Sequence, residues 1–106
     1  MARDPAAPVF AALADPTRRE VVGYLAEHGE ATATELAGVL PVTRQAVSKH
    51  LTALGAAGLV ERRKNGREAR YRLTPAPMTD AMAWMSAVGA AWDERLSALR
   101  RHLGEP

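Results

Sequence analysis

Hydrophobic residues recur at helical spacing through the first half of the chain and predict short helices. The first begins near Pro8, and its apolar side consists of Val9, Phe10 and Leu13. Asp15-Pro16 predicts the start of the second, because Asp is a favoured N-cap and Pro fits the first helical position. Gly29 is expected to end that helix.

The next two predicted helices are separated by a very short turn. Thr32 and Glu35 form a capping-box pattern that begins the first of them, and Pro41 ends it. Thr43 is the N-cap of the second, whose buried side is predicted to consist of Val47, Leu51 and Leu54. Two short helices joined so tightly predict a helix-turn-helix.

The period then changes from helical to alternating, which predicts a β-hairpin. Val60–Lys64 and Arg67–Leu73 form the strands, and Asn65-Gly66 favours a type I′ turn between them. This turn would set Lys64 opposite Arg67, Arg63 opposite Glu68, Glu61 opposite Arg70 and Val60 opposite Tyr71. A looser four-residue tip is the alternative.

A long final helix follows Pro75 and Pro77, and its apolar residues keep a 4-3-4-3 spacing. The stripe consists of Met78, Met82, Met85, Gly89, Trp92, Leu96, Leu99 and Leu103. Such a heptad seam is too long for a domain of this size to cover, so a dimer interface is expected. The alternative is a helix folded wholly onto its own core. On this helix the interface is predicted to consist of Met82, Met85, Trp92, Leu96 and Leu99.

These elements predict a mainly α fold with a small β-hairpin. Residues 1–7 are expected to be a disordered tail and 8–106 a single domain. Within it, 32–57 form the helix-turn-helix, 59–73 the hairpin and 76–103 the dimerisation helix. The 106 residues include no cysteine and no apolar run long enough to span a membrane, so no disulfide and no membrane contact are expected. A cytoplasmic protein associated with the nucleoid is the expectation.

Charge is concentrated in the middle of the chain. Residues 43–74 carry eight Lys or Arg and two Asp or Glu, whereas the segments on either side are net acidic. Such a basic region is typical of a surface that meets nucleic-acid phosphates. The alternative is a solvated charged hairpin with no partner. Because the basic region includes part of the predicted helix-turn-helix, double-stranded DNA is the expected partner.

The outward face of the second motif helix carries side chains suited to a major groove. Those expected to contact bases are Arg44, Gln45, Ser48 and Lys49. Those expected to contact the DNA backbone are Thr43, His50, Thr52, Arg62, Arg63, Lys64, Arg67 and Arg70. Arg70 and Arg72 have a second interpretation, in which they pair with Glu61 or lie along the hairpin.

In these features the chain resembles the ArsR-type (ArsR/SmtB-like) winged helix-turn-helix regulators of bacteria. The resemblance rests on Ala12–Arg19, Glu35–Ala37, Val42–Leu51, Ala57–Val60, Gly66-Arg67 and Tyr71–Leu73. Trp84 and Trp92 resemble those of a subgroup without the metal motif. The resemblance implies a homodimer formed by the first and last helices, which adds Val9, Phe10 and Leu13 of the first helix to the predicted interface. It also implies that this homodimer represses transcription from an imperfect palindrome near a promoter. It also implies an inducer or partner that releases the DNA.

The chain departs from this family at the metal sites. Metal-sensing members have a Cys-x-Cys pair where Ala37 and Val39 stand, and neither side chain can bind a metal. A second family site is represented only by His102 and Glu105, because Asp80 lacks its histidine partner. No metal and no cofactor are expected. His28 is interpreted as a structural residue near a helix end.

Two other functions stay open from the sequence. The winged helix could be a scaffold whose Met- and Trp-containing last helix binds another protein. A MarR-like regulator would keep the DNA-binding function and change the dimer architecture. Enzymatic activity is not expected, because no nucleophile-base set, carboxylate pair or phosphate-binding glycine loop stands out.

Overall fold

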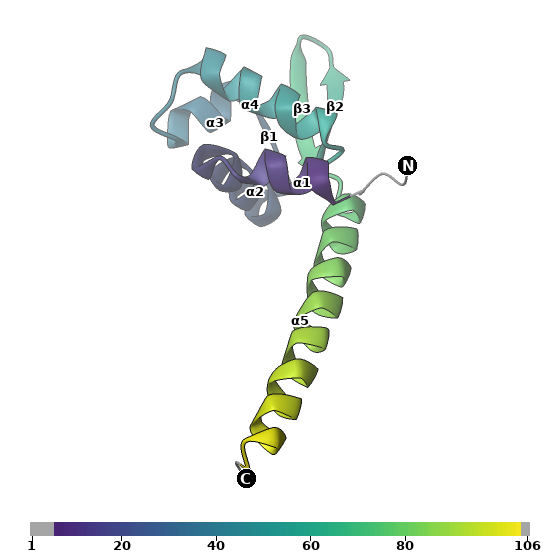
Figure 1. Cartoon of the computed structure of the whole chain (residues 1–106). Helices are drawn as coiled ribbons and strands as arrows, with labels where there is room; N and C mark the ends of the chain where they lie inside the picture. The colour runs from purple at the N-terminus through teal and green to yellow at the C-terminus, as the bar shows by residue number, and fades with distance from the viewer. Residues whose placement is uncertain (1–5, 105–106) are drawn as a thin grey trace.

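Within residues 6–104, which are those the structure describes, the computed structural model contains five helices and three strands. In chain order they are α1 (Ala7–Leu13), α2 (Pro16–His28), β1 (Glu30–Thr32), α3 (Ala33–Val39), α4 (Arg44–Ala56), β2 (Val60–Asn65), β3 (Glu68–Leu73) and α5 (Ala76–His102). The elements up to β3 pack into one body, from which α5 extends as a single long helix (Figure 1). The predicted mainly α fold with a small β-hairpin is confirmed.

The N-terminal boundary differs slightly from the prediction. Helix α1 begins at Ala7, and Ala6 beside it is buried, so both residues belong to the folded body. The expected tail of residues 1–7 is therefore too long at its C-terminal end, while residues 1–5 lie outside the described residues.

Side chains complete the hydrogen bonding where α1 ends and α2 begins. Asp15 Oδ1 accepts hydrogen bonds from the backbone N–H groups of Thr17 at 2.8 Å and of Arg18 at 3.1 Å. The bond from the Arg18 amide is the main cause that lowers the pKa of the Asp15 carboxyl. Arg19 Nη1 donates a hydrogen bond to the carbonyl of Leu13 at 2.7 Å, which gives a partner to a carbonyl at the C-terminal end of α1. The predicted start of α2 is thus confirmed.

The helix-turn-helix forms as its capping residues predict. Thr32 Oγ1 accepts from the backbone N–H of Glu35 at 3.0 Å, and Thr43 Oγ1 accepts from that of Ala46 at 3.1 Å. Helices α3 and α4 then bury one side each in a shared core. The side chains of α3 and α4 that are fully buried there are Leu36, Val47, Leu51 and Leu54.

The hairpin belongs to a three-stranded antiparallel sheet of order β1-β3-β2. Strand β1 was not predicted, because a three-residue strand is too short to show a hydrophobic period. Its central residue, Ala31, is fully buried and pairs with Tyr71 of β3. This strand attaches the hairpin to the segment between α2 and α3.

The hairpin register differs from the favoured one by two residues. Asn65 pairs with Glu68, so the two-residue turn is Gly66-Arg67 and the predicted Asn65-Gly66 turn is wrong. Gly66 has φ 66°, while Arg67 has a negative φ, a pattern that fits a type II′ turn with glycine first. The four-residue tip is not observed either.

The shift changes the cross-strand pairs and keeps each residue on its predicted face. Glu61 lies opposite Arg72 instead of Arg70, and Val60 lies opposite Leu73. The predicted register would have set Lys64 directly opposite another cation, whereas Ala69 is its actual partner. Arg63, predicted opposite Glu68, lies opposite Arg70.

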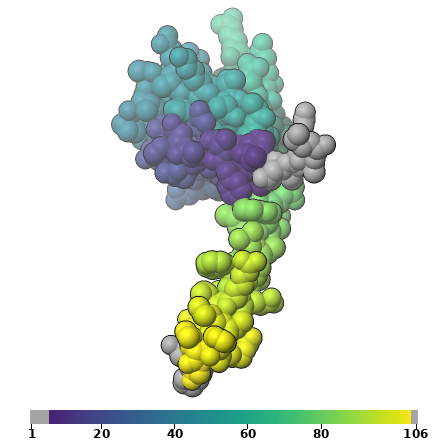
Figure 2. Space-filling model, in the orientation of Figure 1, coloured from purple at the N-terminus to yellow at the C-terminus, as the bar shows by residue number. Residues whose placement is uncertain are grey.

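Helix α5 leaves the core soon after it begins. Met78 packs partly against the core and Ala81 is buried, but every described residue after Ala81 is exposed. Its farther part extends away from the body in the space-filling view (Figure 2). Phe10 of α1 contacts Trp84 of α5 edge-on, with ring centroids 5.7 Å apart. The alternative in which α5 folds wholly onto its own core is therefore wrong for this chain.

Candidate nucleic-acid interface

Helix α4 presents its polar side chains in two directions. Successive residues of a helix are about 100° apart, so Gln45, Lys49 and Thr52 lie opposite the buried stripe. Arg44 and Ser48 lie to one side of them, facing the wing formed by β2 and β3. All five side chains are exposed, as readers of a major groove must be. The sequence placed these residues on one outward face and did not separate the two directions.

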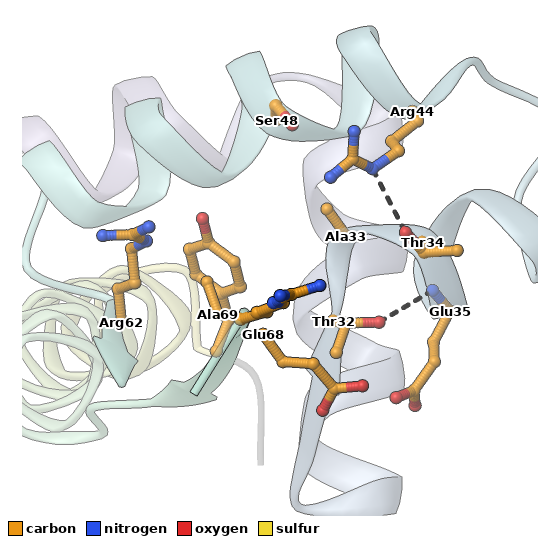
Figure 3. A pocket seen from close by; sticks show the side chains of 11 residues that line it. Thr32, Ala33, Thr34, Glu35, Arg44, Ser48, Arg62, Glu68 and Ala69 are labelled. Carbon is orange, nitrogen blue, oxygen red and sulfur yellow. Dashed lines mark hydrogen bonds between the residues drawn. The ribbon is translucent and has the colours of Figure 1, made fainter. Parts of the chain in front are cut away.

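A groove of about 550 Å³, here called the wing groove, separates α3 and the start of α4 from the wing (Figure 3). Arginines reach it from α4, from β2 and from the wing turn, and hydroxyl groups line it between them. Its lining residues are Thr32, Ala33, Thr34, Glu35, Arg44, Ser48, Arg62, Arg67, Glu68, Ala69 and Tyr71. The groove therefore joins two predicted base-reading residues to two predicted backbone-binding residues.

Arg44 is held inside this groove by a residue of the preceding helix. Its Nε donates a hydrogen bond to Thr34 Oγ1 at 3.1 Å, and both side chains are exposed (Figure 3). Thr34 was not predicted as a site residue. Nothing in the local sequence marks it, because the contact joins two helices across the turn.

The wing cations are not equivalent. Arg62, Arg63, Lys64 and Arg67 are all exposed, and Arg67 occupies the turn between the strands. Arg63 lies 3.7 Å from Glu61, whereas Arg62 and Arg67 line the wing groove. The structure thus leaves these cations accessible to phosphates.

Arg70, predicted as a backbone contact, instead lies among three carboxylates. Its Nε is 2.7 Å from Glu30, and its Nη1 is 3.4 Å from Glu35 and 3.5 Å from Glu68. The hydrogen bond to Glu30 is the main cause that raises the pKa of Arg70. A cation so compensated has little charge to offer a phosphate, so we no longer assign Arg70 to the DNA backbone. Arg72 pairs similarly with Glu61.

The remaining predicted backbone contacts have partners within the protein. Thr43 caps α4, and the Thr52 hydroxyl donates to the Ser48 carbonyl at 3.0 Å. His50 is half-buried on the opposite side of α4 from the wing, where its Nδ1 accepts from Arg18 Nε at 3.3 Å. His50 therefore accepts a hydrogen bond from a cationic side chain of α2. Sequence spacing gave no sign of this contact across 32 positions.

The side chains at the positions of the family's metal sites cannot supply the metal ligands that the resemblance implies. Ala37 and Val39 have hydrocarbon side chains where the resemblance implies thiolates, and the whole sequence has no cysteine. Among residues 6–104, no group of three or more His, Asp or Glu is placed to hold a metal ion. Glu105, part of the second family fragment, lies outside the described residues. No helix in the described part of the chain combines the length and apolarity that crossing a membrane requires.

Similarity to known proteins agrees with this geometry. Residues 13–63 match a family described as helix-turn-helix domain. The chain is 34% identical over 99 residues to the arsenical resistance operon repressor of Escherichia coli (strain K12), covering 90% of this chain and 81% of that protein. It is 31% identical over 77 residues to the transcriptional repressor SdpR of Bacillus subtilis (strain 168), covering 73% of this chain and 84% of that protein.

A solved structure extends the likeness to nearly the whole chain. The ArsR-like transcriptional regulator from Rhodococcus sp. RHA1 has a TM-score of 0.80 and 46% sequence identity, over 95% of this chain and 93% of that one. These relatives are transcriptional regulators, and transcriptional regulation is a binding function, not an enzymatic one. The chain therefore belongs to the ArsR family of winged helix-turn-helix transcriptional regulators and is a DNA-binding protein.

Proposed function

We propose that this chain acts as a homodimeric repressor that binds an imperfect palindrome near a promoter. The single observation that carries the proposal is the uncovered apolar stripe of α5, on a chain that also presents a cationic DNA-reading surface. Each of its large apolar side chains from Met82 onward is at least 40% exposed. A soluble chain rarely leaves so long a stripe in water unless another surface covers it.

A second copy of the chain is the proposed cover. The stripe residues keep heptad spacing, which suits the packing of one helix against another. Phe10 and Leu13 of α1 are half-buried, and Phe10 contacts Trp84 of α5, so α1 extends the apolar surface onto the body. Val9, by contrast, is 1% exposed within its own chain, so we remove it from the predicted interface. The proposed interface residues are Phe10, Leu13, Met82, Met85, Trp92, Leu96 and Leu99.

Pairing would present two copies of α4 to one face of the duplex. Successive major grooves on one face are about 34 Å apart, and a two-fold dimer reads a palindrome with one α4 in each. Arg44, Gln45, Ser48 and Lys49 are proposed to contact bases. Arg62, Arg63, Lys64 and Arg67 are proposed to contact the backbone or an adjacent minor groove. Thr43, His50 and Thr52 stay as weaker backbone candidates.

Repression is proposed to follow from occupancy of the promoter region. A protein that fills two successive major grooves there denies the same surface to the transcription machinery. An inducer or partner protein of unknown chemistry is proposed to release the DNA, and the metal of the family's thiolate sensors is not proposed for this role. Binding to chromosomal DNA would associate the protein with the nucleoid of a bacterial cytoplasm.

Selection of bound fragments from sheared genomic DNA, followed by sequencing, tests the proposal. The expected result is a set of fragments that share two inverted half-sites at a fixed spacing. A salt titration of the selected duplex should show a steep loss of affinity, because cations released from phosphates drive binding. Enrichment of a single unpaired half-site would contradict the dimeric mode, and no enrichment would contradict sequence-specific binding.

A scaffold that binds only another protein is the competing function. It is disfavoured because the wing cations would then face solvent without a role, while relatives are named repressors. A MarR-like dimer is disfavoured by the match in chain trace to an ArsR-like regulator over 95% of this chain.

A further inference from the structure

The contact between Arg44 and Thr34 has a geometry that bears on how bases are read. Arg44 is the first residue of α4 and Thr34 the second residue of α3, so the bond joins the two helices of the motif. The donor is Nε of Arg44, and the acceptor is the hydroxyl oxygen Oγ1 of Thr34, 3.1 Å away. This bond leaves both terminal nitrogens of the guanidinium free of Thr34.

Two free terminal nitrogens form the fork that pairs with a guanine. Arginine reads guanine by donating two hydrogen bonds to its O6 and N7 atoms. With Nε already engaged, the terminal pair is the edge of Arg44 that can make such a contact. We propose that Thr34 is a specificity-determining residue that positions Arg44 to read a guanine through its two terminal nitrogens. This inference rests on the proposed role of Arg44 in base reading.

The chemistry of the anchor supports this role. A hydroxyl is a neutral acceptor, so it orients the guanidinium without compensating its charge, and the charge stays available to the DNA. The carboxylates that line the wing groove, Glu35 and Glu68, are engaged by Arg70. Arg44 is therefore held by a neutral partner, which orients the guanidinium without offsetting its positive charge.

Alignment before binding saves the entropy of ordering a long side chain. Losing it should weaken the contact with the cognate guanine by about 2- to 10-fold for each half-site. The loss should fall on the cognate site and much less on duplexes where that base is changed, since those make no such contact. The ratio of the two affinities, and not overall affinity, is therefore the signature of positioning.

The test compares Thr34→Val, which removes the hydroxyl and keeps the shape, with Thr34→Ser, which restores the hydroxyl. Fluorescence anisotropy measures the Kd of the full-length protein for its selected operator and for operators changed at one guanine at a time. Thr34→Val should lower the discrimination at a single guanine of each half-site, and Thr34→Ser should recover it. Thr79→Val is the matched control, because Thr79 is an exposed helical threonine of α5 that does not line the wing groove.

A double-mutant cycle assigns the effect to Arg44. In an Arg44→Ala background, Thr34→Val should cause no further loss at that guanine. Equal discrimination by Thr34→Val and wild type would overturn the inference while leaving the proposed function standing, provided that Arg44→Ala loses the same guanine. An equal loss in both backgrounds would also overturn it. Wild-type binding by Arg44→Ala would overturn both the inference and the assigned role of Arg44.

Discussion

Replacing Trp92 with alanine should separate the proposed dimer into monomers. Trp92 lies in the apolar stripe of α5 and is 59% exposed in the single chain. A tryptophan can bury about 150–250 Å², so roughly 90–150 Å² per copy is available to an interface. At about 25 cal/mol per Å², this area corresponds to about 2–4 kcal/mol for each copy. Two-fold symmetry doubles the contribution of each substitution.

With the lower end of this range taken for both copies, the expected loss is about 4 kcal/mol, which raises the dimer dissociation constant about a thousandfold. Sedimentation equilibrium over a range of concentrations measures this constant directly. Trp92 is not part of the buried core, so the N-terminal body should keep its fold, as circular dichroism would show. Affinity for a complete palindrome should fall with dimerisation, while affinity for an isolated half-site should change little.

Asp93→Ala provides the matched control, because Asp93 is the next exposed residue of α5 and lies off the stripe. The control should dimerise like the wild type. An unchanged dissociation constant for Trp92→Ala would refute the assignment of the stripe to a second copy. So would a wild-type protein that is monomeric at every concentration tested.

Other variants test the wing and the helix caps. Arg67→Ala should weaken binding to all duplexes alike, because one phosphate contact is lost. The slope of log binding constant against log salt concentration, measured by fluorescence anisotropy, should become shallower by about 1. A loss that depends on the DNA sequence would contradict this role. Arg70→Gln should leave that slope unchanged, since carboxylates compensate its charge; a slope reduced as in Arg67→Ala would return Arg70 to the backbone contacts. The pKa of Asp15 is lowered in the folded protein, so its ionised carboxylate stabilises the fold at pH values above its ordinary pKa of 3.8. This stabilisation is lost as the pH falls through the lowered pKa. The difference in unfolding free energy between wild type and Asp15→Asn, measured with urea, should shrink over that range, and a constant difference would contradict the linkage.

Local chemistry made the helices predictable. Asp15, Thr32 and Thr43 each cap a helix through bonds to amides two or three residues away, so the sequence alone contains the whole interaction. The buried stripe of α4 follows from its spacing for the same reason. The heptad pattern of α5 likewise identified the part of the chain that has no cover within its own body.

Long-range pairing was not predictable in the same way. Strand β1 exists because Ala31 is buried opposite Tyr71, a partner 40 residues away in the sequence. The hairpin register was mistaken because Asn65-Gly66 is a strong local turn signal, whereas the turn in the structure is Gly66-Arg67. The pairing of β1 with β3 depends on contacts that no local window contains.

The candidate site was predicted in kind and corrected in detail. The residue types on α4 and on the wing indicated DNA, and their exposure agrees with that role. The sequence could not show that Arg70 would meet Glu30, Glu35 and Glu68, which come from three different elements. It also could not show that Thr34 would reach Arg44, since helix packing alone determines that distance.

The early exit of α5 from the core has a consequence for how such regulators diversify. Every described residue after Ala81 is exposed, so in the proposed dimer the α5 residues that would choose the partner lie in a different stretch of the chain from the α4 residues proposed to read the operator. Changes along the stripe can alter which copies associate without disturbing the residues of α4. If the proposed interface is correct, several such chains in one genome would be able to keep their dimers from mixing while each one acquires its own operator. In the proposed dimer, the long helix would therefore determine which copies pair, independently of the surface proposed to read DNA.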